Sequence, residues 1–192
     1  MKPADAACVV LASGLSVRFG QTDKLIAELS GKPVLDHVIE IVRSARFGEN
    51  FIVSQGQPQR DFTPVINKTP ESGQGPALRL GLGAARAAGW DCIVLVLGDM
   101  PLIKVSHLHM MLDKLDTGNS IVSDFKGQKM PPAAFRGSAV SSILSDSSAL
   151  GARTIFRLLN PVTVSISAEE ALDVDTPEDL ASVARIMKAR KT

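Results

Sequence analysis

The sequence predicts a three-layer α/β/α protein with a mostly parallel, mixed sheet. Short, continuous apolar segments alternate with amphipathic segments along the 192 residues. Such apolar strands are typical of parallel sheets whose two faces are covered by helices. The clearest are Ala7–Ala12 (ACVVLA) and Cys92–Leu97 (CIVLVL), which have the length of buried strands. No internal repeat or low-complexity linker divides the chain, so we expect one domain over residues 1–192.

The first half of the chain is predicted to alternate strands with two helices. Apolar residues recur at helical spacing from Val34 to Val42, and Pro33 suits the first turn of that helix. A segment rich in alanine and leucine predicts the second helix. The expected elements are a strand at Ala7–Ala12, a helix at Pro33–Ala45, strands at Phe51–Ser54 and Pro64–Asn67, and a helix at Gly75–Ala88.

The second half is predicted to end in a well-defined helix. Thr176 can cap this helix, Pro177 suits its first position, and two acidic residues follow in its first turn. Loops at Gln55–Asp61 and Asp124–Pro132 are expected to be mobile or to face a substrate. The expected elements are a strand at Cys92–Leu97, a helix at Ser106–Leu115, a strand at Ser120–Ser123, helices at Gly137–Leu144 and Ala152–Leu159, a strand at Val162–Ile166 and a helix at Pro177–Lys188.

The composition argues against several classes of partner and location. A net charge of +1 gives no overall field that would favour nucleic acid or a membrane surface. No segment approaches the roughly 18 apolar residues of a membrane span, and the first residues lack the apolar core of a signal peptide. Cys8 and Cys92 both lie in apolar segments, which is typical of reduced core cysteines. We therefore expect a cytoplasmic protein.

The loop that follows the first strand carries two cations at short spacing. Gly14–Lys24 contains Arg18 and ends at Lys24. A glycine-containing loop of this kind presents backbone N–H groups and positive charge to one small volume, which suits a nucleoside triphosphate. The loop lacks the GK[ST] ending of a Walker A sequence and the spacing of G-x-G-x-x-G. From the residues alone, cations such as these would more often be solvated surface charges.

Acidic residues follow another strand and precede the last helix. Asp99 comes after the strand Cys92–Leu97, and Asp173 and Asp175 come before Thr176. Ligands of open α/β sheets bind beyond the carboxyl ends of the strands, where these loops are expected to meet. Two carboxylates that also face substrate phosphates suit Mg²⁺. Each aspartate could alternatively cap a turn or a helix.

Five segments resemble, in order, the motifs of the MobA-like nucleotidyltransferases. LASGLSVRFGQTDKLIAEL, from Leu11 onward, is similar to the opening signature LAAGxSxRFG…DKLL, and LGDMP at Leu97–Pro101 is similar to the second motif. DVDTPEDL at Asp173–Leu180 resembles the closing DIDTPEDL. PAAF at Pro132–Phe135 and Gly151–Arg153 are similar to two further motifs. The latter ends a GDxGAR motif in which Ser148 and Ala149 replace the usual Gly-Asp.

This resemblance implies a Rossmann-like nucleotidyltransferase fold and a Mg²⁺-dependent transfer of a nucleotide to a phosphorylated acceptor. In the branch that looks most similar, CTP or GTP gives CMP or GMP to the terminal phosphate of molybdenum cofactor (molybdopterin), and pyrophosphate leaves. An acceptor phosphate is already ionised at neutral pH. The protein therefore needs to align two anions and offset their repulsion, without a side-chain base.

The resemblance also implies roles for individual residues. Lys24, Arg18 and Asp99 would be catalytic: Lys24 at the α-phosphate, Arg18 at the departing pyrophosphate, and Asp99 with Asp175 as ligands of Mg²⁺. The segment Gly73–Ala77 would lie beside the base, whose identity the motifs leave open. The implied nucleotide-binding residues are Leu11, Ala12, Ser13, Gly14, Ser16, Arg18, Lys24, Gly73, Gly75, Pro76, Ala77 and Asp99.

Three alternatives stay open at the level of sequence. The acceptor could be another phosphorylated molecule, such as a sugar phosphate, a methylerythritol-type phosphate or a phospholactate-like acid. A non-catalytic protein that binds nucleotide or cofactor could instead assist a molybdoenzyme or its chaperone, an interpretation that the changed GDxGAR motif favours. A plain dinucleotide-binding domain is the third alternative. Asp99 and Asp175 argue against it, because no metal is needed to hold a dinucleotide.

Overall fold

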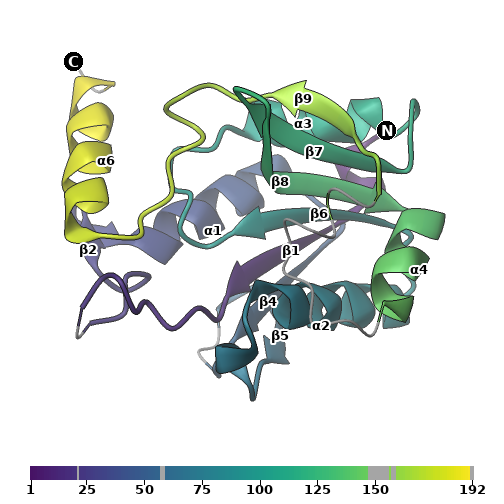
Figure 1. Ribbon diagram of the computed structural model, residues 1–192, viewed down its shortest axis with the longest axis horizontal. Coiled ribbons are helices and arrows are strands. Elements are labelled where there is room, and N and C mark those ends of the chain that lie inside the picture. Colours follow the sequence, from purple (N-terminus) through teal and green to yellow (C-terminus); the bar gives the residue numbers. More distant parts are fainter. Residues whose placement is uncertain (21, 57–58, 147–155, 157–158, 191–192) are drawn as a thin grey trace.

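A mixed β-sheet with helices on both faces forms the centre of the protein (Figure 1). The computed structural model describes residues 1–192 except 21, 57–58, 147–155, 157–158 and 191–192. The strands are β1 (Ala7–Ala12), β2 (Glu28–Leu29), β3 (Lys32–Pro33), β4 (Glu49–Ser54), β5 (Thr63–Ile66), β6 (Cys92–Leu97), β7 (Ser120–Phe125), β8 (Gln128–Arg136) and β9 (Val162–Ser165). The α-helices are α1 (Val34–Ala45), α2 (Gln74–Ala87), α3 (Val105–Lys114), α4 (Ser138–Ser145) and α6 (Pro177–Ala189), and Pro3–Asp5 and Pro70–Ser72 form short 3₁₀ turns.

Within the described residues, the main sheet has seven strands in the order β5-β4-β1-β6-β8-β7-β9. Strands β5, β4, β1 and β6 are parallel, and β7 is parallel to β9. Strand β8 is antiparallel to both β6 and β7. The predicted α/β class and mostly parallel mixed sheet are therefore confirmed. Strands β2 and β3, which the sequence did not predict, form a separate short hairpin.

The helices form the two outer layers. Helix α2 packs on β1, β4 and β5 and contacts α4, while α3 packs on β7, β8 and β9 and contacts α1. Figure 1 shows α2 and α4 on one side of the sheet and α1 and α3 on the other. Among the described residues, no helix is long and apolar enough to cross a bilayer.

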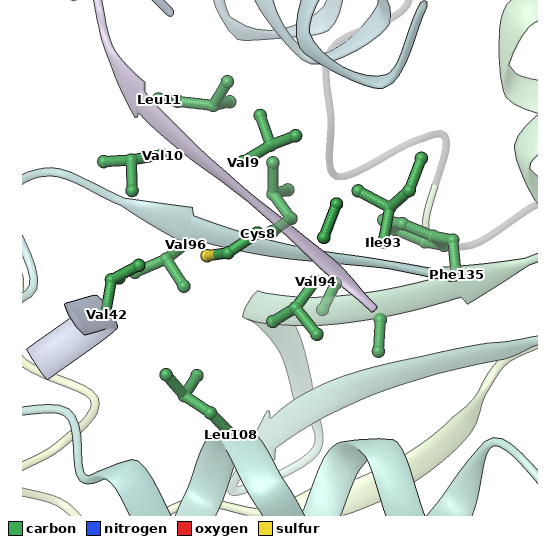
Figure 2. Close-up of a cluster of buried hydrophobic side chains, with 14 of the residues drawn as sticks. Cys8, Val9, Val10, Leu11, Val42, Ile93, Val94, Val96, Leu108 and Phe135 are labelled. Atoms are coloured by element: carbon green, nitrogen blue, oxygen red, sulfur yellow. The ribbon is translucent and has the colours of Figure 1, made fainter. Parts of the chain in front are cut away.

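The core lies around β1 and β6, whose side chains are almost all buried. Residues on both faces of these strands are apolar because helices cover both faces. Cys8 is fully buried and belongs to the same cluster as Val42 of α1 and Val96 of β6 (Figure 2). Burial raises the pKa of its thiol well above the ordinary value. Cys8 and Cys92 are free thiols, as expected for reduced core residues.

Two glycines of α2 allow a direct test of how closely this helix approaches the sheet. A Cβ atom at Gly81 would lie 2.5 Å from Val9 Cγ1 and 2.8 Å from Val53 Cγ2, whereas one at Gly83 would meet Leu144 at an ordinary 3.7 Å. We expect Gly81→Ala to lower the free energy of unfolding by about 1–3 kcal/mol through overpacking. The control Gly83→Ala should raise it by about 0.5–1 kcal/mol, because alanine favours a helix. Urea denaturation measures both, and equal effects would contradict this packing.

The carboxyl ends of β1 and β6 mark the point where the chain changes direction across the sheet. From β1 the chain crosses to β4 on one side, and β6 lies on the other side of β1. The two strand ends stay joined, since Gly98 N–H donates to the Leu11 carbonyl at 2.8 Å. A Cβ atom at Gly98 would lie 3.0 Å from Leu35 and 3.2 Å from that carbonyl oxygen, so the close approach suits glycine. Ligands of open α/β sheets bind at such a switch point.

Helix α6 lies beyond this end of the sheet, beside β2 (Figure 1). Thr176 and Asp179 form the capping box at its start, where the sequence predicted the helix to begin. Val183 packs with Leu29, Leu102 and Val174 in a second buried apolar cluster. The helix is therefore anchored to the loops that leave β1 and β6, and it holds the residues just before Thr176 close to them.

The predicted loop at Asp124–Pro132 is wrong, because most of it belongs to a hairpin. Strand β7 continues to Phe125, and β8 begins at Gln128. Proline usually argues against a central strand, and two prolines here hid the pattern. Both lie at a register shift between β7 and β8, where Val122 pairs with Ala133 and the next pair is Ser123 with Met130. A bulge of this kind leaves prolines unpaired without disrupting the rest of the ladder.

Two sequence expectations fall outside the described residues. The predicted helix at Ala152–Leu159 lies mostly among residues 147–155 and 157–158, and so does the segment Gly151–Arg153. The other predicted helices and strands match observed ones to within two residues at each end.

Candidate active site

Lys24 lies at the centre of a cluster of four charged side chains at the switch point. Its ammonium nitrogen Nζ is 2.5 Å from Asp99 Oδ2 and 2.6 Å from Asp175 Oδ1. Arg18 donates to the other oxygen of Asp175, Oδ2, at 2.5 Å. We call Arg18, Lys24, Asp99 and Asp175 the ionic cluster. The sequence indicates all four as candidates, and the structure brings them together.

Three segments far apart in the chain deliver these side chains. Lys24 comes from the loop after β1, Asp99 comes directly after β6, and Asp175 lies two residues before α6. The backbone fixes the last two relative to each other, because Val174 N–H donates to the Asp99 carbonyl at 2.9 Å. The capping box of α6 then holds the chain that follows Asp175, whose own N–H donates to Asp179.

Burial makes the charges of the cluster strongly interdependent. The Lys24 side chain is only 11% exposed and that of Asp99 only 10%. Burial tends to lower the pKa of Lys24, but Asp99 and Asp175 outweigh it and raise the pKa above its ordinary value. Burial also raises the pKa of Asp99, despite its contact with Lys24. The pKa of Asp173 is raised by desolvation and then by the charges of Asp99 and Asp175. Because the two carboxylates raise its pKa, Lys24 stays protonated at neutral pH.

A cavity of about 270 Å³ opens on one side of the ionic cluster. It lies between the loop after β1 and the start of α2, and both segments contribute residues to its lining. Its size suits a small polar molecule or the larger part of a nucleotide. The residues that line it are Leu11, Ser13, Gly14, Leu15, Lys24, Leu25, Pro70, Glu71, Gly73, Gln74, Ala77, Leu97 and Asp99.

A second cavity of about 790 Å³ opens on the other side. Its walls combine apolar side chains from β7 and β8 with the acids that precede α6. The residues that line it are Arg18, Gln74, Leu97, Asp99, Met100, Phe125, Gln128, Met130, Pro131, Phe156, Ala171, Asp173 and Asp175. Gln74, Leu97 and Asp99 line both cavities, so the two spaces meet beside Asp99 and Lys24.

Most of the sequence-predicted nucleotide residues border the first cavity. Leu11, Ser13, Gly14, Lys24, Gly73, Ala77 and Asp99 line it, whereas Arg18 lines the second cavity. Ala12, Ser16, Gly75 and Pro76 are absent from both linings. Gly75 is buried within the first turn of α2, and Ser16 uses its hydroxyl inside the loop, where it donates to Asp23 at 2.8 Å.

Sequence reasoning missed several residues of the two cavities. Glu71 lies two residues before the predicted segment Gly73–Ala77, and Gln74 lies within that segment but was not singled out. Phe125, Gln128 and Met130 belong to the segment Asp124–Pro132, which the sequence predicted to be mobile or to face a substrate without singling out any residue. Their apolar and amide side chains carry no motif, and the hairpin of β7 and β8 brings them to the site.

The carboxylates of the cluster fit a divalent cation that is shared with phosphate oxygens. Asp99 Oδ1 is buried and has no hydrogen-bond partner among the described residues. This oxygen is therefore free to coordinate a cation. No group of three or more acidic, histidine or cysteine residues in the described chain could hold a metal. Mg²⁺ characteristically binds through one or two carboxylates, with water and substrate phosphates completing its shell.

The three histidines make their hydrogen bonds elsewhere. His37 Nε2 lies 2.7 Å from the Leu29 carbonyl, His107 Nε2 lies 2.9 Å from Ser123 Oγ, and His109 Nε2 lies 3.0 Å from the Ala45 carbonyl. None lines either cavity beside the cluster. Burial lowers the pKa of His37 and His107, which keeps both neutral.

The fold and the site together define a class: an α/β protein of the nucleotidyltransferase fold, with its cavity at the switch point. Solved structures support the fold. The crystal structure of Rv0371c from Mycobacterium tuberculosis superposes with a TM-score of 0.79 at 22% identity, over 96% of this chain and 100% of that one. A complex of Rv0371C with manganese superposes with a TM-score of 0.74 at 19% identity, over 94% and 98%.

Sequence comparison gives the family. The model of the MobA-like NTP transferase domain matches residues 8–164, and the chain therefore belongs to that family. A curated relative, the probable molybdenum cofactor guanylyltransferase of Aquifex aeolicus, is 33% identical over 122 residues. That alignment spans 62% of this chain and 58% of the relative. Asp173 and Asp175 lie beyond the residues that the family model matches.

Proposed function

We propose that the protein is a metal-dependent nucleotidyltransferase that moves a nucleotide from an NTP to the terminal phosphate of molybdopterin and releases pyrophosphate. One observation carries the proposal: two cavities, each suited to one substrate, meet at Asp99 beside the buried cation of Lys24. Family membership and the name of the A. aeolicus relative support the reaction and the acceptor.

The smaller cavity is the proposed nucleotide site. It is bordered by the glycine-containing loop after β1 and by the start of α2, both of which offer backbone N–H groups to an anion or a base. The sequence left the base open between cytosine and guanine. The curated relative is a guanylyltransferase, so we propose GTP as the preferred substrate and CTP as the alternative.

The larger cavity is the proposed acceptor site. Phe125, Met130 and Pro131 give it an apolar wall, and Gln128 adds an amide. A planar, partly apolar ring system such as a pterin fits this wall better than a sugar, which would need many hydrogen-bonding groups. The terminal phosphate of the acceptor would then lie at the junction, close to Lys24.

The proposed chemistry is an in-line displacement at phosphorus. An oxygen of the acceptor phosphate forms a bond to the α-phosphorus, the bond from that phosphorus to the bridging oxygen breaks, and pyrophosphate leaves with the electron pair. Lys24 offsets the charge that develops on the α-phosphate, and Arg18, whose side chain is 72% exposed, holds the departing pyrophosphate. No side chain has to remove a proton, since the acceptor phosphate is already ionised.

We propose Asp99 and Asp175 as the residues that hold Mg²⁺. When bound, such a cation neutralises negative charge on the phosphates. The support is Asp99 Oδ1, which lacks a hydrogen-bond partner in the described part of the chain, and the fact that Rv0371C, which shares the fold, forms a complex with manganese. The same two carboxylates hold Lys24 in place, so they orient the lysine as well as the metal.

We also propose that residues 1–192 act as one domain in the cytoplasm. The support is the continuous main sheet, to which both halves of the chain contribute strands, and the two free core thiols. A molybdoenzyme or its chaperone is a further proposed partner, because the product would have to reach an enzyme that uses it.

Nucleotide choice can be tested by thermal unfolding with CTP, GTP, ATP and UTP, each with Mg²⁺. At a thousandfold excess over its dissociation constant, a ligand should stabilise the protein by about 4 kcal/mol. We expect GTP to give the largest shift, and then pyrophosphate release when molybdopterin is added. The same NTP panel with EDTA is the control. A lack of any shift would count against the function, and a shift without pyrophosphate release would favour a non-catalytic binding protein.

A further inference from the structure

Asp23 joins two parts of the loop after β1, although it touches neither cavity. Its carboxylate oxygen Oδ1 accepts hydrogen bonds from the Ser16 hydroxyl at 2.8 Å and from the Leu25 N–H at 3.0 Å. Ser16 Oγ in turn accepts from the Lys24 N–H at 3.2 Å. These three bonds connect the glycine-containing side of the loop to the backbone of the lysine at the centre of the site.

Ser16 needs such support because of its backbone conformation. Its φ angle is +52°, in the left-handed region that residues with a Cβ atom rarely adopt. Conformations of this kind persist when surrounding contacts hold them. Here the Ser16 carbonyl accepts from Phe19 N–H at 2.9 Å, and its hydroxyl is bound to Asp23. The Ser16 hydroxyl donates its proton to Asp23, so it does not donate to a phosphate. The loop would therefore bind a phosphate through its backbone N–H groups.

The same network fixes the backbone from which the Lys24 side chain starts. Lys24 N–H is held by Ser16 and Leu25 N–H by Asp23, and the Leu25 carbonyl accepts from Leu35 N–H of α1 at 3.0 Å. The Leu25 side chain is also buried in the core. The loop is therefore anchored on one side by Asp23 and on the other by α1, and the Lys24 side chain extends from this anchored backbone to Asp99 and Asp175.

We propose that Asp23 is a positioning residue of the transferase site: it holds Ser16 and, through Ser16 and Leu25, places Lys24 at the junction of the two cavities. The role of Lys24 in catalysis rests on the proposed function, whereas the anchoring of the loop does not. The task of Asp23 is to accept two hydrogen bonds, and its negative charge is not required for that. Asparagine at position 23 keeps an acceptor oxygen, and alanine does not.

The first test is amide hydrogen exchange in the protein without substrates. Asp23→Ala should speed the exchange of the Lys24 and Leu25 amides, because both lose the network that protects them. Asp23→Asn should leave their exchange close to that of the unmodified protein. Asp113→Ala is the matched control, since the Asp113 side chain is 72% exposed and contacts the N-terminal amine. Unchanged exchange in Asp23→Ala would overturn the anchoring role.

The second test is kinetic and uses pyrophosphate release. Asp23→Ala should lower kcat by about 10²-fold, the loss expected for a misplaced catalytic group, with a smaller change in nucleotide Kd. Asp23→Asn should restore most of kcat. In a double-mutant cycle, Ser16→Ala combined with Asp23→Ala should lose no more than the worse single variant, because both break one network.

The outcomes separate the two ideas. Additive losses in the cycle, or an asparagine variant as slow as the alanine variant, would overturn the positioning of Lys24 through Ser16. A protein that releases no pyrophosphate with any NTP and acceptor would instead refute the proposed function. In that event the exchange measurement still decides whether Asp23 anchors the loop.

Discussion

Replacing Lys24 with alanine is expected to reduce the rate of pyrophosphate release by roughly a thousandfold, the upper range for the loss of one charge-stabilising donor. The Lys24 ammonium is the buried cation at the junction of the two cavities, and Asp99 and Asp175 hold it there at 2.5 and 2.6 Å. Two substrate anions would approach that junction, and the variant would present them with two carboxylates and one exposed arginine. The measurement is single-turnover kinetics at saturating NTP, with nucleotide Kd determined separately.

The control for this variant is Lys104→Ala. Lys104 is half-exposed and pairs with Glu170 at 3.8 Å, and neither residue lines either cavity. We expect it to keep full activity. Since Lys24→Ala also leaves Asp99 buried without its partner, thermal unfolding must show that the variant is folded. If nucleotide affinity falls while kcat stays unchanged, Lys24 binds the substrate without stabilising the transition state, and its proposed role is wrong.

Asp99→Asn is expected to abolish metal-dependent pyrophosphate release. The change keeps the shape of the side chain but removes the charge that a hard divalent cation requires. Asp99 lines both cavities, and its buried Oδ1 has no hydrogen-bond partner within the part of the chain that the structure describes. Titration with Mg²⁺ and with Mn²⁺ should show no saturable activation in the variant, and Mn²⁺ binding followed by electron paramagnetic resonance should weaken.

Asp113→Asn is the matched control, because Asp113 is an exposed aspartate of α3 outside both cavities. It should respond to both metals as the unmodified protein does. Full activity in Asp99→Asn at ordinary Mg²⁺ concentrations would remove Asp99 from the metal site. Asp175→Asn is informative beside it, since it tests whether the second carboxylate is needed for the metal or mainly for holding Lys24 and Arg18.

The continuous apolar strands made the central part of the fold predictable. The segments ACVVLA and CIVLVL are β1 and β6, and the residues that follow them, from Ser13 and from Gly98, lie at the switch point. The start of α6 was equally clear, because Thr176 and Asp179 form a local capping box. These features depend on neighbouring residues, and local sequence patterns express them directly.

The remaining features depend on contacts that no local pattern records. Lys24 meets Asp99 and Asp175 across sequence separations of 75 and 151 residues. Strand β8 was not predicted because its two prolines argue against a central strand. The strand accommodates them only at the bulge opposite Val122 and Ser123. The role of Asp23 was also hidden: the opening motif names it beside Lys24, but the hydrogen bond to Ser16 appears only once the loop has folded.

The position of Asp175 has a consequence for how the protein is made. The sheet strands β1, β4, β5 and β6 are complete by Leu97, yet the ionic cluster lacks one of its two carboxylates until residue 175 has been synthesised. Chains are synthesised and begin to fold from the N-terminus. Until residue 175 has been synthesised, Lys24 lacks its second carboxylate and Arg18 lacks the carboxylate to which it donates. The ionic cluster is therefore completed only when the segment leading into α6 docks.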